Sequence, residues 1–316
     1  MDEIFNTLIF TQIVITATFF LIPTLGEIYV ERSGILNLGI EGMIIASAAG
    51  SYLVAYMTDN YILGILAGML IGGILSLIHA VLTITFSRNQ IISGIGLTIF
   101  GTGLSGFLGR EVAGKPLKHG LAKITLSGLA DIPVIGQIFF NQNIIVYFSY
   151  LLVPILWFIL FKTRIGILIR TVGENPHAAH NQGVNVKLIR YATVVFGGVC
   201  AGISGSLLSL NSFWVEGMTN SRGWIVIALV VVALWNPLGA VLGSYIFGAF
   251  DVLQFSFQQT PIPIIFPSGI PAPILDAFPY LFTILFLAIW ALILSQQKIK
   301  STLGAPTALA VPFEEE

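Results

Sequence analysis

Apolar stretches long enough to cross a bilayer alternate with short polar turns along nearly the whole chain. A membrane-spanning helix needs about 20 predominantly apolar residues, because the hydrocarbon core is about 30 Å thick. This pattern predicts nine spans, with eight or ten as the alternatives if one segment is broken or re-entrant. The predicted spans are 5–25, 35–57, 61–86, 91–108, 143–161, 191–210, 223–235, 238–257 and 280–295.

Glycines at helical spacing indicate that some of these helices pack closely together. Gly64, Gly68 and Gly72 recur every fourth residue in the span 61–86, and the span 191–210 is again rich in glycine. Small residues at this spacing allow the backbones of two membrane helices to approach each other. A tightly packed helical bundle is therefore expected.

The composition agrees with an integral membrane protein. Of the 316 residues, 56% are hydrophobic and only 9% are charged, whereas soluble domains carry about 25% charged residues. The alternating ten-residue segments of a transmembrane β-barrel are absent. We therefore predict an all-α, polytopic transmembrane bundle that forms a single domain over residues 1–316, and the plasma membrane as its location. The single cysteine excludes an internal disulfide.

The segment 162–190 is the longest strongly basic and weakly apolar interval of the chain. An excess of Lys and Arg beside membrane spans is typical of the cytoplasmic side. Within it, Asn175 and Pro176 resemble an N-cap followed by proline at the first helical position, and Gly183 resembles a helix stop. The sequence thus predicts a short helix over 176–182, at which a cytoplasmic partner docks.

Alternation of the spans from this basic loop predicts the orientation of the chain. The N-terminus falls outside, and the tail 296–316 falls in the cytoplasm. The longest polar interval, 109–142, falls outside although it carries four basic residues. Long segments translocate largely regardless of charge, so we expect 109–142 to be an extracytoplasmic loop.

Polar residues within the spans are the candidates for a transport pathway. Asn37 and Glu41 are four residues apart and would share a helix face. A carboxylate inside a span normally faces the bundle interior or a water-filled path. The alternative is an ion pair at the helix end, for example with Arg32. Asp251 and Gln254 form a polar stripe on a later span, which predicts either the pathway or a hydrogen-bonded seam between helices.

A second candidate surface lies between the sixth and seventh predicted spans. It combines aromatic, amide and charged side chains: Asn211, Phe213, Trp214, Glu216, Asn220, Arg222 and Trp224. Aromatic faces beside amide groups would suit a flat heterocycle at an external mouth, with Trp214 and Glu216 as pathway residues. The alternative is that the same aromatics form only an interfacial belt.

Two nucleotide-binding patterns occur without the context that their chemistry needs. The sequence GREVAGK at 109–115 fits most of a phosphate-binding loop, but Pro116 stands where a magnesium-binding Ser or Thr is required. The sequence GTGLSG at 101–106 lies inside an apolar span, where glycines usually serve packing. The histidines show no metal-ligand spacing, and no nucleophile–base arrangement is present. We therefore expect no catalytic residues, no metal site and no cofactor in this chain.

Three stretches resemble the permease subunits of bacterial and archaeal nucleoside ABC importers. They are ERSGILNLGIEGMIIASA at 31–48, VGENPHAAHNQGVNV at 172–186 with the glycine-rich helix after it, and WNPLGAVLGSYIFGAFDVLQ at 235–254. They occur in the family's order over most of the chain. The resemblance weakens in the segment 109–142 and in the tail. Branched-chain amino acid and ribose permeases share the architecture.

The resemblance implies a transport subunit that works with several partners. These are a cytoplasmic ABC ATPase that uses ATP and Mg²⁺, a second permease subunit and an extracytoplasmic solute-binding lipoprotein. The residues matching the family's coupling helix are Glu174, Asn175, Pro176, His177, Ala178 and Ala179. The family pattern has Arg in place of His177 and a smaller or acidic residue in place of His180, which leaves open how the loop contacts its ATPase.

Nucleosides are the expected cargo, and three alternatives remain open. An ABC permease for ribose-type sugars or branched-chain amino acids would share the same architecture. A self-sufficient secondary transporter would instead require charged residues near the membrane centre on two symmetric broken helices. In the sequence, Glu41 is a clear candidate for one of them, with no matched partner in the second half.

Overall fold

Helices dominate the fold because backbone groups in an apolar environment must find their hydrogen-bond partners within the protein. The computed structural model describes residues 2–258, 271, 274, 277–296 and 304–313. The long helices are α1 (Asp2–Arg32), α2 (Ile40–Thr58), α3 (Tyr61–Ala80), α4 (Gln90–Gly109), α6 (Ile144–Lys162), α9 (Val186–Leu210), α11 (Pro237–Gln258) and α13 (Phe278–Gln296). The prediction of a mainly helical bundle is confirmed.

The shorter elements connect or extend these helices. A π-helical turn, η1 (Val81–Thr85), continues α3. The shorter helices include α5 (Ile135–Phe139), α7 (Arg164–Glu174), α8 (Pro176–Asn181) and α10 (Gly223–Val232). Strands β1 (Lys123–Thr125) and β2 (Asn141–Asn143) pair antiparallel, with Ile124 opposite Gln142.

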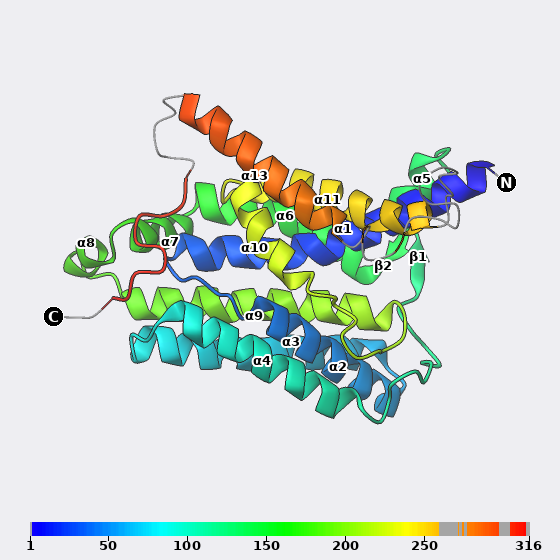
Figure 1. The fold of residues 1–316 in the computed structure, drawn as a ribbon, viewed down its shortest axis with the longest axis horizontal. Helices are drawn as coiled ribbons and strands as arrows, with labels where there is room; N and C mark the ends of the chain where they lie inside the picture. Colours follow the sequence, from blue (N-terminus) through cyan, green and yellow to red (C-terminus); the bar gives the residue numbers. More distant parts are fainter. Residues whose placement is uncertain (1, 259–270, 272–273, 275–276, 297–303, 314–316) are drawn as a thin grey trace.

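The long helices run roughly along one axis, so the molecule has two distinct ends (Figure 1). The N-terminus, α5 and the β1–β2 pair lie at one end, called here the N-terminal end. Helices α7 and α8 and residues 304–313 lie at the other, called here the α8 end. The polar segments that flank the bundle are thus sorted to opposite ends.

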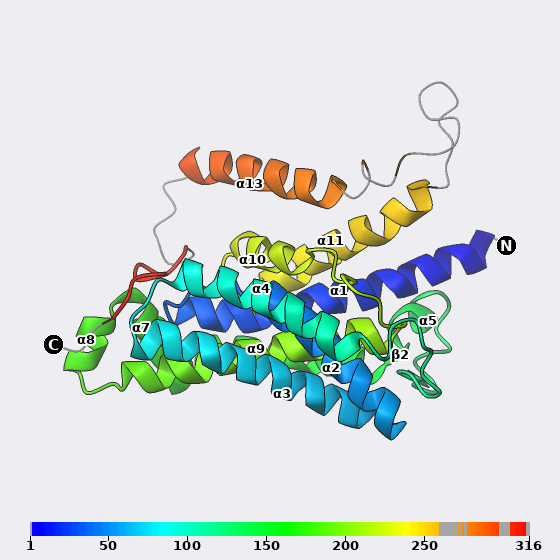
Figure 2. The same cartoon turned by 60° about the horizontal axis from the view of Figure 1, so that its bottom comes forward.

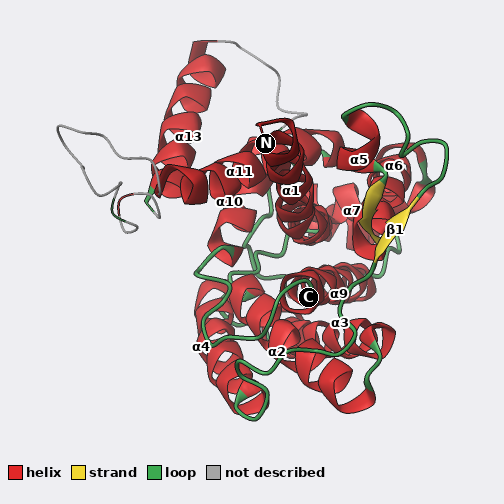
Figure 3. Cartoon of the chain, turned by 90° about the vertical axis from the view of Figure 1, so that its right-hand side faces the viewer, coloured by secondary structure: helices red, strands yellow, loops and turns green. Residues whose placement is uncertain are grey.

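Helix α9 lies at the centre and packs against α1, α2 and α3. Seen along the helices, α2, α3, α4 and α9 form one group, with α1 and α11 in the other (Figure 3). The predicted close packing of glycines is confirmed between α3 and α9. A Cβ on Gly72 would collide with the Gly198 carbonyl, and one on Gly202 would collide with the Gly68 carbonyl. Helix α13 lies at an edge of the bundle (Figure 2), in contact with α10 and α11.

Seven helices among the described residues are long and apolar enough to cross a membrane. They include α1 from Thr7 onward, α3 with η1, and α11 as far as Gln254. The predicted seventh span, 223–235, is instead the ten-residue helix α10. Ten helical residues rise about 15 Å, which is half the hydrocarbon thickness. The second predicted span is also shorter at its start, because α2 begins only at Ile40.

The first predicted span was too short. The predicted span 5–25 leaves Glu27, Glu31 and Arg32 outside the first helix, but α1 continues through Arg32 and buries all three side chains. Each has a partner inside the protein. Glu31 accepts a hydrogen bond from the Trp235 indole N–H (2.6 Å), and Arg32 donates to the carbonyls of Leu234 and Trp235. These contacts satisfy polar groups that lie beyond the end of the predicted first span.

Candidate functional site

Helices α2 and α10 begin inside the bundle rather than at its ends (Figure 1). Helix α2 follows the non-helical stretch 33–39, and α10 follows the loop 211–222. The first turn of any helix leaves backbone N–H groups without partners in the helix. Helix starts buried in a bundle therefore need polar partners from elsewhere in the protein.

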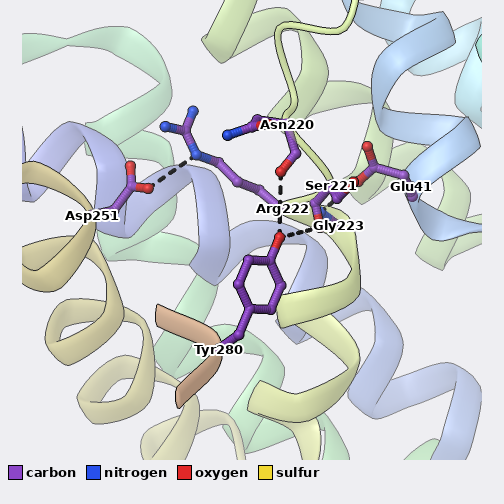
Figure 4. Close-up of polar contacts among 7 residues, drawn as sticks. All are labelled: Glu41, Asn220, Ser221, Arg222, Gly223, Asp251 and Tyr280. Atoms are coloured by element: carbon purple, nitrogen blue, oxygen red, sulfur yellow. Dashed lines mark hydrogen bonds and ion pairs between the residues drawn. The ribbon is translucent and has the colours of Figure 1, made fainter. Parts of the chain in front are cut away.

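Glu41, in the first turn of α2, supplies hydrogen-bond acceptors to the start of α10. One carboxylate oxygen accepts a hydrogen bond from the backbone N–H of Gly223 (2.6 Å), and the other accepts from the hydroxyl of Thr219 (2.5 Å). The Glu41 side chain is buried. A carboxylate at a helix N-terminus is favoured both by the free N–H groups and by the helix dipole. Figure 4 shows Glu41 facing the turn that opens α10.

The turn before α10 is also held from the opposite side. The guanidinium of Arg222 forms an ion pair with Asp251 of α11 (3.1 Å), and both side chains are largely buried. The hydroxyl of Tyr280, on α13, donates to the carbonyls of Asn220 and Ser221 (3.4 and 3.5 Å; Figure 4). Side chains from α2, α11 and α13 thus converge on one short turn.

The backbone of this turn adopts an unfavourable conformation. Asn220 and Ser221 are consecutive non-glycine residues with φ of 47° and 61°. Left-handed φ angles are uncommon outside glycine, and such strain persists only where surrounding contacts enforce it. Here the contacts are those of Glu41, Asp251 and Tyr280. We call residues 219–223 the strained turn.

A cavity of about 550 Å³ opens beside the strained turn, between α1, α9 and α11. Its volume lies within the range of small-molecule sites, about 300–1,000 Å³. The lining is largely apolar and includes Phe19 and Leu207. Its polar lining residues are Gln12, Thr16, Asn211, Ser212, Arg222 and Asp251. An apolar cavity with a few converging polar groups can bind a small organic molecule and fix its orientation.

The structure separates the two polar residues that sequence analysis placed on one helix face. Asn37 precedes α2, so it shares no helix with Glu41. Its side-chain amide donates to Glu27 (2.7 Å), and its carbonyl oxygen accepts from the backbone of Gly39 (3.0 Å). The alternative pairing of Glu41 with Arg32 is also wrong, because Glu41 contacts the strained turn.

Of the two pathway residues predicted at the external mouth, Glu216 lies at the surface and Trp214 does not. Trp214 is buried, and its indole lies so close to Gly109 that a Cβ there would collide with it. It belongs to a cluster with Tyr52 and Leu210, so it packs the end of α4 and does not line an opening. Glu216 is exposed near Gly106. Neither Trp214 nor Glu216 lines the cavity.

The structure brings two of the predicted pathway residues to one place. Glu41 and Asp251 contact the strained turn from opposite sides. Gln254 is buried one turn further along α11 and does not line the cavity. Sequence analysis missed Thr219, Gly223 and Tyr280, and it noted Arg222 only as part of the mouth. The signal that could have identified Arg222 is its position, directly before the short apolar run 223–235.

The predicted short helix at the basic loop is confirmed as α8. The side-chain oxygen of Asn175 accepts a hydrogen bond from the backbone N–H of Ala178 (2.9 Å), as an N-cap does. Gly183 has φ of +80°, which suits a helix stop. The residues that matched the coupling helix divide by burial: Pro176 and Ala179 are buried, whereas Glu174, Asn175, His177 and Ala178 are exposed. Helix α8 therefore presents a small exposed face at its end of the bundle.

Comparison with known proteins places these features in a family. The family of branched-chain amino acid transport system permease components matches residues 9–294. A protein of Haloferax volcanii, provisionally named a glucose ABC transporter permease, is 38% identical, with 95% of each chain covered. The nucleoside ABC transporter permease protein of Lactococcus lactis is 35% identical and covers 91% of this chain and 94% of its own. A guanosine ABC transporter permease protein of Bacillus subtilis is 34% identical over 84% of this chain and 86% of its own.

Proposed function

Because this chain belongs to the family of branched-chain amino acid transport system permease components, we propose that it is the permease subunit of an ATP-driven importer of nucleosides. It is a multi-pass protein of the plasma membrane, with seven long apolar helices among its described residues. Two relatives with more than four-fifths of this chain covered carry names that specify a nucleoside or guanosine. These relatives are the main support for nucleosides as cargo.

The proposed topology has nine crossings, with the N-terminus outside and the tail 296–316 in the cytoplasm. The stretch 33–39 with α2 makes one crossing, and the loop 211–222 with α10 makes another. Helices α1, α3, α4, α6, α9, α11 and α13 make the rest. The position of residues 304–313 beside α8, at the end opposite the N-terminus (Figure 1), supports this arrangement. The segment 109–142 is then extracytoplasmic, and 162–190 is the cytoplasmic coupling loop.

The ATPase docks on α8 in this proposal. The exposed His177 and Ala178 would contact it, while the buried Pro176 and Ala179 anchor the helix to the bundle. Glu174 and Asn175 open the helix. ATP and Mg²⁺ bind to the partner ATPase, and this chain contributes no catalytic residue and no cofactor. A second permease subunit and an extracytoplasmic solute-binding lipoprotein complete the transporter.

Substrate passes through the cavity beside the strained turn. The observation that carries this assignment is the convergence of Glu41 and Asp251 on the strained turn, which contains Arg222 and opens a half-length helix. The amide, hydroxyl and charged groups at the cavity wall match the hydrogen-bonding edges of a nucleoside. Phe19 offers an apolar surface for a base. A rearrangement of the turn would open or close the path without melting a long helix.

A sugar is the second candidate cargo, because the 38% identical relative is provisionally named for glucose. A sugar has no aromatic base and carries a hydroxyl group on most of its carbons, so it would depend more on the polar lining than a nucleoside does. Competition between the two classes of solute therefore distinguishes them.

Affinity purification through this chain tests the assembly. Native membranes are extracted in a mild detergent, and the co-purifying proteins are identified by mass spectrometry. The proposal predicts an ABC ATPase, a second permease and a solute-binding protein, the last of which binds nucleosides more tightly than glucose, ribose or leucine. Recovery of the chain alone from intact membranes would refute an ATP-driven importer.

A further inference from the structure

The C-terminal residues 304–313 return to the α8 end of the bundle and lie against both α8 and the core (Figure 1). Pro306, Ala308 and Phe313 are buried, although they follow the last long helix of the chain. A tail that merely trails from a membrane protein has no reason to bury such side chains. We call residues 304–313 the strap.

One set of strap contacts holds the helices of the coupling loop. The backbone N–H and the hydroxyl of Thr307 both donate to the Glu174 carboxylate (3.2 and 2.7 Å). The backbone N–H of Ala308 donates to the carbonyl of Gly173 (2.9 Å). Glu174 and Gly173 end α7, immediately before α8. The strap therefore holds the junction between α7 and α8 in place.

Phe313 forms the second set of contacts, at α8 itself. Its ring centroid lies 5.0 Å from that of His177 and 5.9 Å from that of His180. The guanidinium of Arg190, on α9, lies 5.8 Å from the same centroid, within the distance of a cation–π contact. Val172 and Ala179 complete the pocket around the ring. Phe313 thus packs between α8 and the start of α9.

A third set of contacts joins the strap to the bundle near the start of α2. The backbone N–H of Ala310 donates to the carbonyl of Gly34 (3.1 Å), and Arg32 donates to the carbonyl of Gly304 (3.5 Å). Gly34 is the second residue of the stretch 33–39, which leads to α2 and Glu41. The strap consequently connects α8 to the non-helical stretch 33–39, which leads into α2, where Glu41 contacts the strained turn.

We infer that the strap is a coupling element, in which Phe313 is a positioning residue that makes movement of α8 carry the stretch 33–39 with it. This inference rests on the proposed function, since it requires an ATPase that moves α8. The contacts support it because the strap touches α8, the junction between α7 and α8, and the stretch 33–39 that precedes α2. Without the strap, α8 would still be folded by its own cap at Asn175 and packed against α7 and α9, but it would lose the contacts through which the strap joins it to Gly34.

The test compares Phe313→Ala with Phe313→Tyr in the purified, reconstituted transporter. Both ATP hydrolysis and substrate uptake are measured per assembled complex. Loss of a coupling contact raises the ATP hydrolysed per molecule imported, and we expect a rise of about fivefold for Phe313→Ala, at the low end of typical coupling energies. A contact that serves stability alone would lower both rates together and leave their ratio unchanged. Phe313→Tyr keeps the ring and restores the ratio.

Val311→Ala is the matched control, because Val311 lies in the strap but is 49% exposed. Its ratio should equal that of the wild type. A wild-type ratio for an assembled Phe313→Ala complex overturns the inference while the importer itself still works. If Phe313→Ala does not fold, Thr307→Val decides, because it removes the hydroxyl bond to Glu174 and leaves the buried ring in place. An unchanged ratio in that variant equally overturns the inference, whereas failure of the wild-type chain to recruit an ATPase refutes the proposed function itself.

Discussion

The carboxylate of Glu41, in the first turn of α2, accepts a hydrogen bond from the backbone N–H of Gly223, in the first turn of α10. Two interrupted segments from opposite halves of the chain are thereby joined at their helix starts. A secondary transporter would need a matched charged residue on the second broken segment. In the described residues, α10 contributes the backbone N–H of Gly223 to this contact, and its charged neighbour Arg222 is paired with Asp251.

Replacing Glu41 tests this junction. Glu41→Ala leaves the Gly223 N–H and the Thr219 hydroxyl without their acceptor, and an unpaired buried group costs about 1–3 kcal/mol. We expect a lower melting temperature in detergent and uptake reduced on the order of tenfold, which corresponds to ~1.4 kcal/mol. Glu41→Gln keeps one acceptor oxygen and should have a smaller effect. Wild-type stability and uptake in Glu41→Ala would show that the junction is dispensable.

Gly223 should tolerate no side chain. A Cβ at this position would collide with the carboxylate and the Cα of Glu41, so Gly223→Ala must displace α2 from α10. We expect strongly reduced yield of inserted, monodisperse protein, measured by size-exclusion chromatography in detergent. Gly103→Ala is the control, because a Cβ on Gly103 in α4 meets open space. Equal yields for the two variants would contradict the contact.

The ion pair between Arg222 and Asp251 should show strong coupling in a double-mutant cycle. Loss of one partner leaves a largely buried charge, which costs about 3 kcal/mol or more, whereas loss of both costs less. We therefore expect Arg222→Gln and Asp251→Asn each to destabilise the protein more than the double variant does. Thermal unfolding in detergent measures the stabilities, and uptake kinetics should show a raised KM for Asp251→Asn. Additive effects would indicate that the pair does not act as a unit.

The sequence could predict elements whose signals are local. The apolar runs identify the membrane class, and Asn175, Pro176 and Gly183 predict α8 nearly residue for residue. The start of α2 could not be predicted, because the apolar pattern continues through the stretch 33–39. That stretch is held out of a helix by distant partners: Glu27 binds Asn37, and Gln90 accepts from the backbone of Leu36.

The same limit explains the errors at the candidate site. Trp214 resembled an interfacial aromatic, but its burial depends on Gly109 at the far end of α4. The pairing of Arg222 with Asp251, and that of Glu31 with Trp235, join segments whose proximity only the folded bundle reveals. Polar residues could thus be identified as important from the sequence, while their partners could not.

Binding of the ATPase at α8 should be sensitive to a large side chain on the exposed face of this helix. Ala178 is exposed on this helix, so Ala178→Trp should leave the bundle folded and obstruct the ATPase. We expect the amount of ATPase that co-purifies with this chain to fall on the order of tenfold. Thr125→Trp, exposed in β1 at the N-terminal end, is the control and should retain the ATPase. Full recovery of the ATPase with Ala178→Trp would place the docking surface elsewhere.

Uptake by the reconstituted complex tests the central claim most directly. The complex purified through this chain is placed in liposomes with its solute-binding protein outside, and entry of radiolabelled guanosine is followed with and without ATP inside. We expect uptake that requires ATP, is competed by unlabelled nucleosides and is unaffected by excess glucose or leucine. Nucleoside entry without ATP, or ATP-dependent entry of glucose that nucleosides do not inhibit, would contradict the assignment.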